Sequence, residues 1–158
     1  MNLSKIEKIV GIALAALLFV VTLGSTFFFL GQLKVSVVDW IAFNSSAVIS
    51  FLYLGCFITF LISKKGGMLV FTSLPSFFLG TMSMVVLPWS GSWLFAHVTH
   101  VIMTVNMLWA FYIVLKHKAY KGMAIWLLAG MLIFVPYIVY VQTYNQAHAE
   151  ELMRLLQQ

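Results

Sequence analysis

The sequence predicts an all-α membrane protein, a compact bundle of about five transmembrane helices. Three observations support this fold class. Apolar residues make up 63% of the 158 positions, only 8% of the residues are charged, and the mean hydropathy is +1.03. Soluble domains are about a quarter charged. A water-soluble protein of this length could not bury so much apolar surface, whereas a bilayer covers that surface directly.

The apolar residues fall into five long runs. Each run is long enough to cross about 30 Å of hydrocarbon, which takes roughly 20 helical residues. In lipid each run must be a helix, because an open strand would leave backbone groups unpaired. The breaks between runs are short, so we expect residues 1–145 to form one transmembrane domain of antiparallel neighbours. The runs cover about 8–31, 36–63, 68–88, 92–115 and 122–143.

The basic residues predict the orientation. Two of them, Lys34 and Arg154, fall on one side of the alternating pattern, and the other seven fall on the opposite side. Cytoplasmic loops carry the excess of lysine and arginine. We therefore expect a cytoplasmic N-terminus and an external C-terminus, in the plasma (inner) membrane of a prokaryote. The seven residues on the cytoplasmic side are Lys5, Lys8, Lys64, Lys65, Lys116, Lys118 and Lys121.

The segment 146–158 is a polar tail with four apolar residues near its end. Their spacing predicts either a short helix on the outer surface or an extension of the fifth span. These apolar residues are Leu152, Met153, Leu155 and Leu156. With so little chain outside the lipid, we expect the function to lie in the helices or in a partner.

Three ionisable side chains lie inside the predicted spans: Asp39, His97 and His100. Such groups cost several kcal/mol in lipid, so they usually face a partner, a cavity or a ligand. At 1.5 Å per residue, Asp39 lies roughly 6 Å inside its helix end and the histidines roughly 8 and 12 Å inside theirs. The similar depth predicts one polar site between the second and fourth spans. The alternatives are an interfacial carboxylate and neutral rings that hydrogen-bond across helices.

A metal or haem is one interpretation of this site. His97 and His100 are three positions apart on one helical face, and Asp39 would complete a set of two imidazoles and a carboxylate for a divalent metal. A haem needs axial ligands on opposite sides of the iron, so only one of these histidines could serve it. The H-x-x-H spacing also arises often by chance.

A polar stripe offers a second interpretation, a path for a proton or cation. Ser46, Ser50 and Tyr53 continue the face of Asp39 along the second span, and Thr104 continues the histidine stripe. They would line a narrow wet crevice. Small residues four positions apart, such as Ser46 and Ser50, also let helices approach closely.

No motif for an established chemistry is present. The chain contains no Gly-rich phosphate loop, no H-E-x-x-H and no G-x-S-x-G, and no basic patch suits nucleic acid. We therefore favour a non-enzymatic protein, either an accessory subunit of a membrane complex or a small solute or ion carrier. Its partners would be the lipid bilayer and other membrane subunits or copies of itself. The alternative is a redox or metal-dependent membrane protein that uses the His97, His100 and Asp39 cluster.

Overall fold

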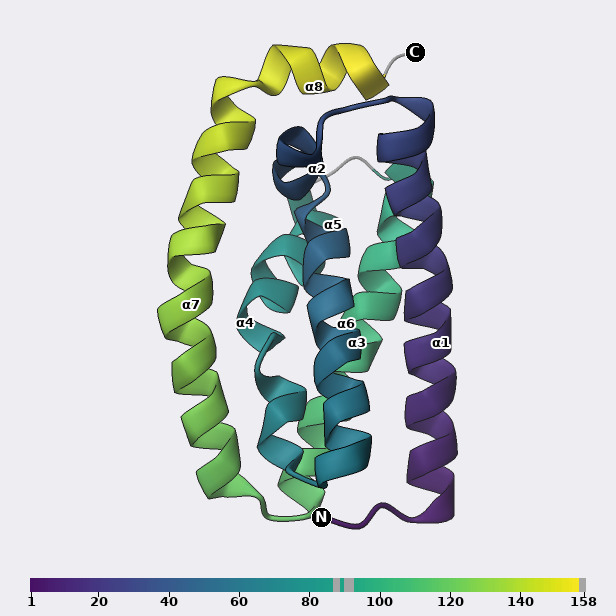
Figure 1. Ribbon diagram of the computed structural model, residues 1–158, viewed down its shortest axis with the longest axis vertical. Coiled ribbons are helices and arrows are strands. Elements are labelled where there is room, and N and C mark those ends of the chain that lie inside the picture. Colours follow the sequence, from purple (N-terminus) through teal and green to yellow (C-terminus); the bar gives the residue numbers. More distant parts are fainter. Residues whose placement is uncertain (87–88, 90–92, 157–158) are drawn as a thin grey trace.

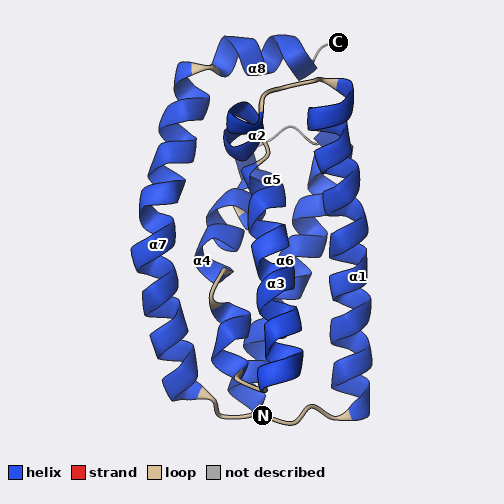
Figure 2. Ribbon diagram, viewed as in Figure 1, coloured by secondary structure: helices blue, strands red, loops and turns tan. Residues whose placement is uncertain are grey.

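The computed structural model describes residues 1–86, 89 and 93–156 of the chain. Within this part every regular element is a helix and no strand occurs (Figure 2). Five helical segments are long and apolar enough to cross a membrane, which confirms the predicted number. They are Lys5–Gln32, Ser45–Ser63, Gly66–Val86, Leu94–Lys116 and Tyr120–Ala147.

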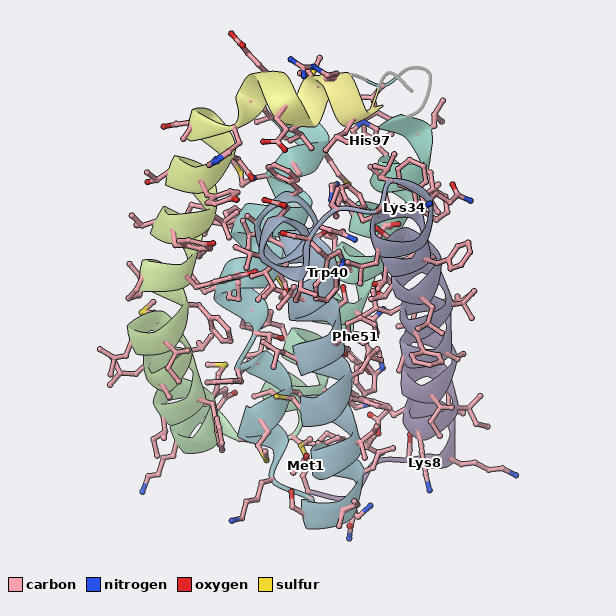
Figure 3. All side chains as sticks on the ribbon, turned by 45° about the horizontal axis from the view of Figure 1, so that its top comes forward. Met1, Lys8, Lys34, Trp40, Phe51 and His97 are labelled. Carbon is pink, nitrogen blue, oxygen red and sulfur yellow. The ribbon has the colours of Figure 1, made fainter. Side chains whose placement is uncertain are left out.

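The long helices run side by side along one axis, and a short helix lies across one end (Figure 1). The long elements are α1 (Lys5–Phe27), α3 (Ser45–Ser63), α6 (Trp93–Lys116) and α7 (Tyr120–Ala147), and the crossing element is α8 (Ala149–Leu156). We call the two ends the α8 end and the lysine end. Met1 and Lys8 lie at the lysine end, whereas Lys34 and His97 lie at the α8 end (Figure 3).

Helix α1 begins with a capping box and packs closely on α6. The hydroxyl of Ser4 accepts a bond from the backbone N–H of Glu7, while the Glu7 carboxylate accepts one from the N–H of Ser4. Further along, a Cβ at Gly11 would overlap the ring of Trp109 on α6. Because Gly11 has no side chain, α1 and α6 can pack closely at this point.

The second predicted span, 36–63, is not one continuous helix. It is divided at Asn44 into a short helix α2 (Val37–Phe43) and the long α3. Asn44 has φ −117° and ψ 41°, outside the helical region, so the hydrogen-bond ladder is interrupted there. The prediction missed this break because Asn44, Ser45 and Ser46 have apolar residues on both sides, so the segment still looks like one span.

The third predicted span, 68–88, is helical but irregular as far as Val86. It starts as a 3₁₀ turn, η2 (Gly66–Val70), and continues through α4 (Ser73–Ser76), a π-helical turn η3 (Phe77–Thr81) and α5 (Ser83–Val86). Residues 87, 88 and 92, which the predicted spans include, lie outside the described residues. Near its start a Cβ at Gly67 would meet the backbone of Gly122, so η2 packs directly on the first turn of α7.

Two further elements complete the fold. The first span ends in a π-helical turn, η1 (Phe28–Gln32). Helix α7 is longer than the predicted 122–143 and ends at His148, where the chain turns into α8. The tail therefore forms a separate short helix, one of the two predicted alternatives. Leu152 and Leu155 are its half-buried residues, whereas Glu150, Glu151 and Arg154 are exposed.

Candidate ligand-binding cavity

Asp39 pairs with the fifth span rather than with a histidine. It lies in the first turn of α2, where its Oδ2 accepts a bond of 2.6 Å from the hydroxyl of Ser36. Its Oδ1 accepts a second bond of 2.6 Å from the hydroxyl of Tyr144 on α7. These two bonds hold the pKa of the Asp39 carboxyl below its usual range. Asp39 is thus a carboxylate that joins α2 to α7.

Two more hydrogen bonds hold α2 against α7. Tyr137 donates its hydroxyl to the carbonyl of Ile41 at 3.0 Å, and Asn145 donates Nδ2 to the carbonyl of Ala42 at 3.3 Å. The carbonyls of this last turn of α2 would otherwise lack partners, because the helix ends at Asn44. α7 therefore caps a helix from which it is distant in the sequence.

His97 and His100 are both buried, with exposed fractions of 1% and 6%. The ring of His97 stacks on Trp89, with the two ring centres 4.0 Å apart. His100 instead lines a large cavity. The two neighbours on one helix therefore have different surroundings.

The structure does not assemble the predicted metal-ligand set. Among the described residues, which include Asp39, His97 and His100, no three His, Cys, Asp or Glu side chains are grouped so that they could hold a metal ion. Asp39 is engaged with Ser36 and Tyr144, and His97 with Trp89. His100 is the only one of the three that contributes to the cavity.

The predicted polar stripe is largely bonded to the protein itself. Ser50 donates its hydroxyl to the carbonyl of Ser46 at 2.8 Å, and Tyr53 donates to the carbonyl of Asn106 at 3.3 Å. Thr104 donates to the carbonyl of His100 at 2.8 Å and lies 2.9 Å from the hydroxyl of Thr81. Of the four stripe residues, only Ser46 lines the cavity. The stripe holds helices together and does not continue the cavity.

A cavity of about 710 Å³ lies at the α8 end of the bundle. Its walls come from all five spans, and Leu152 of α8 adds to them. The walls are mainly apolar and rich in phenylalanine, and none of the lining residues that the structure describes is Asp, Glu, Lys or Arg. The apolar lining residues are Phe28, Phe29, Phe43, Phe78, Leu79, Met82, Val86, Phe95, Ala96, Val141 and Leu152.

Both π-helical turns border this cavity, and they share a sequence. Residues 28–31 and 77–80 each read Phe-Phe-Leu-Gly. In each turn the first phenylalanine carbonyl accepts a bond from the N–H five residues on, at 2.9 Å from Leu33 and 2.8 Å from Met82. The paired rings stand edge to face in both turns. Single π turns in helices occur often at functional sites, and these two contribute aromatic side chains to one cavity.

The polar residues of the cavity lie on several elements. Ser25 of α1 donates its hydroxyl to Oδ1 of Asn44 at 3.1 Å, Ser83 of α5 donates to the carbonyl of Leu79, and Thr99 of α6 donates to the carbonyl of Phe95.

Comparisons of the chain with protein-family models, with curated proteins and with solved structures found no match. The function must therefore be argued from the site itself.

The sequence analysis missed several residues of this site. Asn44 was treated as part of a span, and the phenylalanines of the π turns were counted only as apolar residues. The repeated Phe-Phe-Leu-Gly was a usable signal, since it occurs once in the first span and once in the third. The position of Asn44 gave no such signal.

A second polar cluster lies at the lysine end, away from the cavity. The side chain of Glu7, only 7% exposed, forms an ion pair of 2.7 Å with Lys116 and lies 3.4 Å from Nε2 of His117. Together with Ser4, these residues tie the start of α1 to the end of α6. This cluster serves to anchor two helices.

Proposed function

We propose that the protein is a non-enzymatic membrane protein that binds a small, uncharged, largely apolar molecule in the cavity at its α8 end. The observation that carries this proposal is the cavity itself. Its 710 Å³ falls within the range of about 300–1,000 Å³ that is usual for small-molecule sites. Such sites have apolar and aromatic walls with placed polar groups. This lining combines five phenylalanines and other apolar residues with uncharged polar side chains.

The chemistry of the lining favours an uncharged ligand over an ion. A charged molecule that leaves water needs an opposite charge or several strong hydrogen bonds. The described lining residues include no carboxylate and no lysine or arginine. Asp39 has its two carboxylate oxygens bonded to Ser36 and Tyr144. Of the predicted classes, a small-solute carrier or binding subunit therefore suits the site better than an ion carrier.

The position of the cavity suits a ligand taken up from the outer side of a membrane. The lysine end carries the lysines that we expect in the cytoplasm, and the cavity lies at the opposite end, beside α8. Phe28, Phe78 and Phe95 line the cavity and are also partly exposed on the surface of the bundle. An apolar ligand could therefore enter from the lipid between these rings.

The test is to fill the cavity. Ala96→Phe would place a ring among the lining residues, whereas Ala124→Phe adds the same ring on an exposed face of α7. We expect 1-methoxynaphthalene to raise the unfolding temperature of the wild type and of the Ala124→Phe variant in nanodiscs, but not that of Ala96→Phe. The anion 1-naphthalenesulfonate should stabilise none of the three.

Two results would contradict the proposal. One is an equal shift in the Ala96→Phe protein, which would place binding elsewhere or in the lipid. The other is stronger stabilisation by the sulfonate than by the uncharged ether, which would mean that the cavity selects anions. For each ligand, the three proteins are compared in the same lipid at the same total concentration, so partition into the bilayer is common to them.

A further inference from the structure

The cavity contains a hydrogen-bond donor that the protein leaves unused. Asn44 is 4% exposed and lines the cavity. Its Oδ1 accepts the hydroxyl of Ser25 at 3.1 Å, which orients the amide, and its Nδ2 has no partner among the described residues. A buried amide N–H without a partner is costly, so native proteins rarely leave one unpaired. Asn44 is therefore placed to donate to a ligand.

The same walls also offer unused acceptors. Asn145 lines the cavity and donates its Nδ2 to Ala42, while its buried Oδ1 has no partner in the described part of the chain. His100 lines the cavity as well, is 6% exposed, and has no hydrogen-bond partner for Nδ1 among the described atoms. A neutral imidazole has one nitrogen that accepts a hydrogen bond. Because Oδ1 of Asn145 can only accept, the ligand group must be able to donate.

The hydroxyls around the cavity do not change this requirement. Those of Ser25, Ser83 and Thr99 already donate to protein oxygens. A hydroxyl has one proton and two lone pairs, so what remains for a ligand is acceptor capacity. Nδ2 of Asn44 is thus the buried amide donor of the described lining that has no partner there, beside the hydroxyls of Ser45 and Ser46.

We propose that the ligand carries an uncharged group that both accepts and donates hydrogen bonds, a hydroxyl or a carboxamide, attached to an apolar body. Asn44 donates a hydrogen bond to the oxygen of this group, and the group donates a hydrogen bond to Oδ1 of Asn145 or to a ring nitrogen of His100. The phenylalanines of the two π turns enclose the apolar body. This inference rests on the proposed function and specifies the ligand of the same cavity.

The experiment compares three probes of nearly equal shape. Naphthalene forms no hydrogen bond, 1-methoxynaphthalene only accepts, and 1-naphthol accepts and donates. Binding is measured from the unfolding temperature of the full chain in nanodiscs over a range of probe concentrations. We expect each hydrogen bond gained along the series to tighten binding about threefold to tenfold, so that 1-naphthol binds best.

Variants assign the bonds to residues. Asn44→Leu should remove the advantage of the ether over naphthalene, because both would then lack the donor. Asn145→Leu and His100→Phe should reduce the advantage of 1-naphthol over the ether. Asn106→Leu is the matched control, since Asn106 is a buried asparagine outside the cavity whose Nδ2 bonds to Leu14 and Ile102. It should lower stability and leave the order of the probes unchanged.

The outcomes separate this inference from the proposed function. Equal affinity for the three probes in the wild type, with binding still lost in Ala96→Phe, would overturn the hydroxyl or carboxamide group and leave the cavity as a binding site. If no probe raises the unfolding temperature of the wild type more than that of Ala96→Phe, the cavity itself is overturned as a binding site. The wild-type series tests the hydroxyl or carboxamide group even where the Asn44, Asn145 or His100 variant fails to fold.

Discussion

Asp39 is bonded on both sides, to Ser36 in its own turn and to Tyr144 on α7. The two hydroxyls donate to the ionised carboxylate, and they lose this role when the carboxyl takes up a proton. The depressed pKa of Asp39 is therefore also a statement about stability. At the scale of the residue, this carboxylate couples the position of α2 to the charge state of one group.

The sign of the pH dependence follows from the direction of the pKa shift. A carboxyl with a lowered pKa in the folded state stabilises the fold above its unfolded pKa of about 3.9, and this contribution is lost as the pH falls through the lower, folded value. We expect the unfolding temperature of the wild type to fall more between pH 5 and pH 3 than that of Asp39→Asn. Circular dichroism at 222 nm would follow both. Tyr144→Phe should show an intermediate slope, and equal slopes for all three would contradict the role of Asp39.

Asp39, His97 and His100 were predicted at the depth where they lie, but not with the partners that they have. The reason is geometric. Hydropathy and the helical rise give the depth of a side chain, and they placed Asp39 and the histidines at one end of the bundle, as the structure does. They contain no information on which helices are neighbours around the bundle axis. Asp39 therefore accepts a hydrogen bond from Tyr144 of the fifth span, and the predicted pairing with His97 or His100 of the fourth span does not form.

At the scale of the element, α8 lies across the end of the bundle (Figure 1) and contributes to the wall of the cavity. Leu152 lines the cavity, while Leu155 is half-buried beside it on the same helix. The turn before α8 is at His148, whose ring stacks on Tyr144 with centres 4.1 Å apart. One apolar face thus holds α8 over the cavity.

Loosening α8 should open the cavity. We expect Leu152→Glu combined with Leu155→Glu to speed the reaction of N-ethylmaleimide with Ser46→Cys by about thirtyfold, because each half-buried leucine contributes on the order of 1 kcal/mol to closure. The reaction is measured in a Cys56→Ala background, since Cys56 is the single native cysteine.

Met153→Glu is the control, because Met153 is 48% exposed on the same helix. It should leave the rate of labelling near that of the parent protein. If Met153→Glu and the double variant react equally fast, α8 does not cover the cavity through its leucines.

The elements show where a hydropathy pattern stops being informative. The five spans were predictable because each needs a long apolar run, and burial in lipid depends on that run alone. The break at Asn44 and the two π turns change the hydrogen-bond register without changing the apolar character of the sequence. These features depend on which backbone carbonyl accepts the hydrogen bond of each N–H, and tertiary contacts determine that pairing.

At the scale of the whole molecule, the two ends differ in chemistry. The lysine end has the close contact of η2 with α7, with Gly67 against Gly122, and the ion pair between Glu7 and Lys116. The α8 end has the cavity and the short helix. A bundle with this asymmetry would present different surfaces to the two sides of a membrane.

The distribution of lysines predicts which end faces the cytoplasm. In a Cys56→Ala background, we expect Glu151→Cys to react with a membrane-impermeant maleimide in intact cells, and Lys65→Cys to react only after the membrane is permeabilised. Both positions are exposed in the structure. The reverse pattern would invert the proposed orientation and move the cavity to the cytoplasmic side.

The π turns also constrain the length of the chain. Each one contains one residue more than regular α-helical bonding would use, and each residue turns a helix by about 100°. Deleting a residue from η1 or η3 would give a more regular main chain, but it would swing Phe29 or Phe78 away from the cavity. A one-residue deletion there would therefore cost binding while making the helix itself more uniform, so spacing matters at these two places as much as the identity of the side chains.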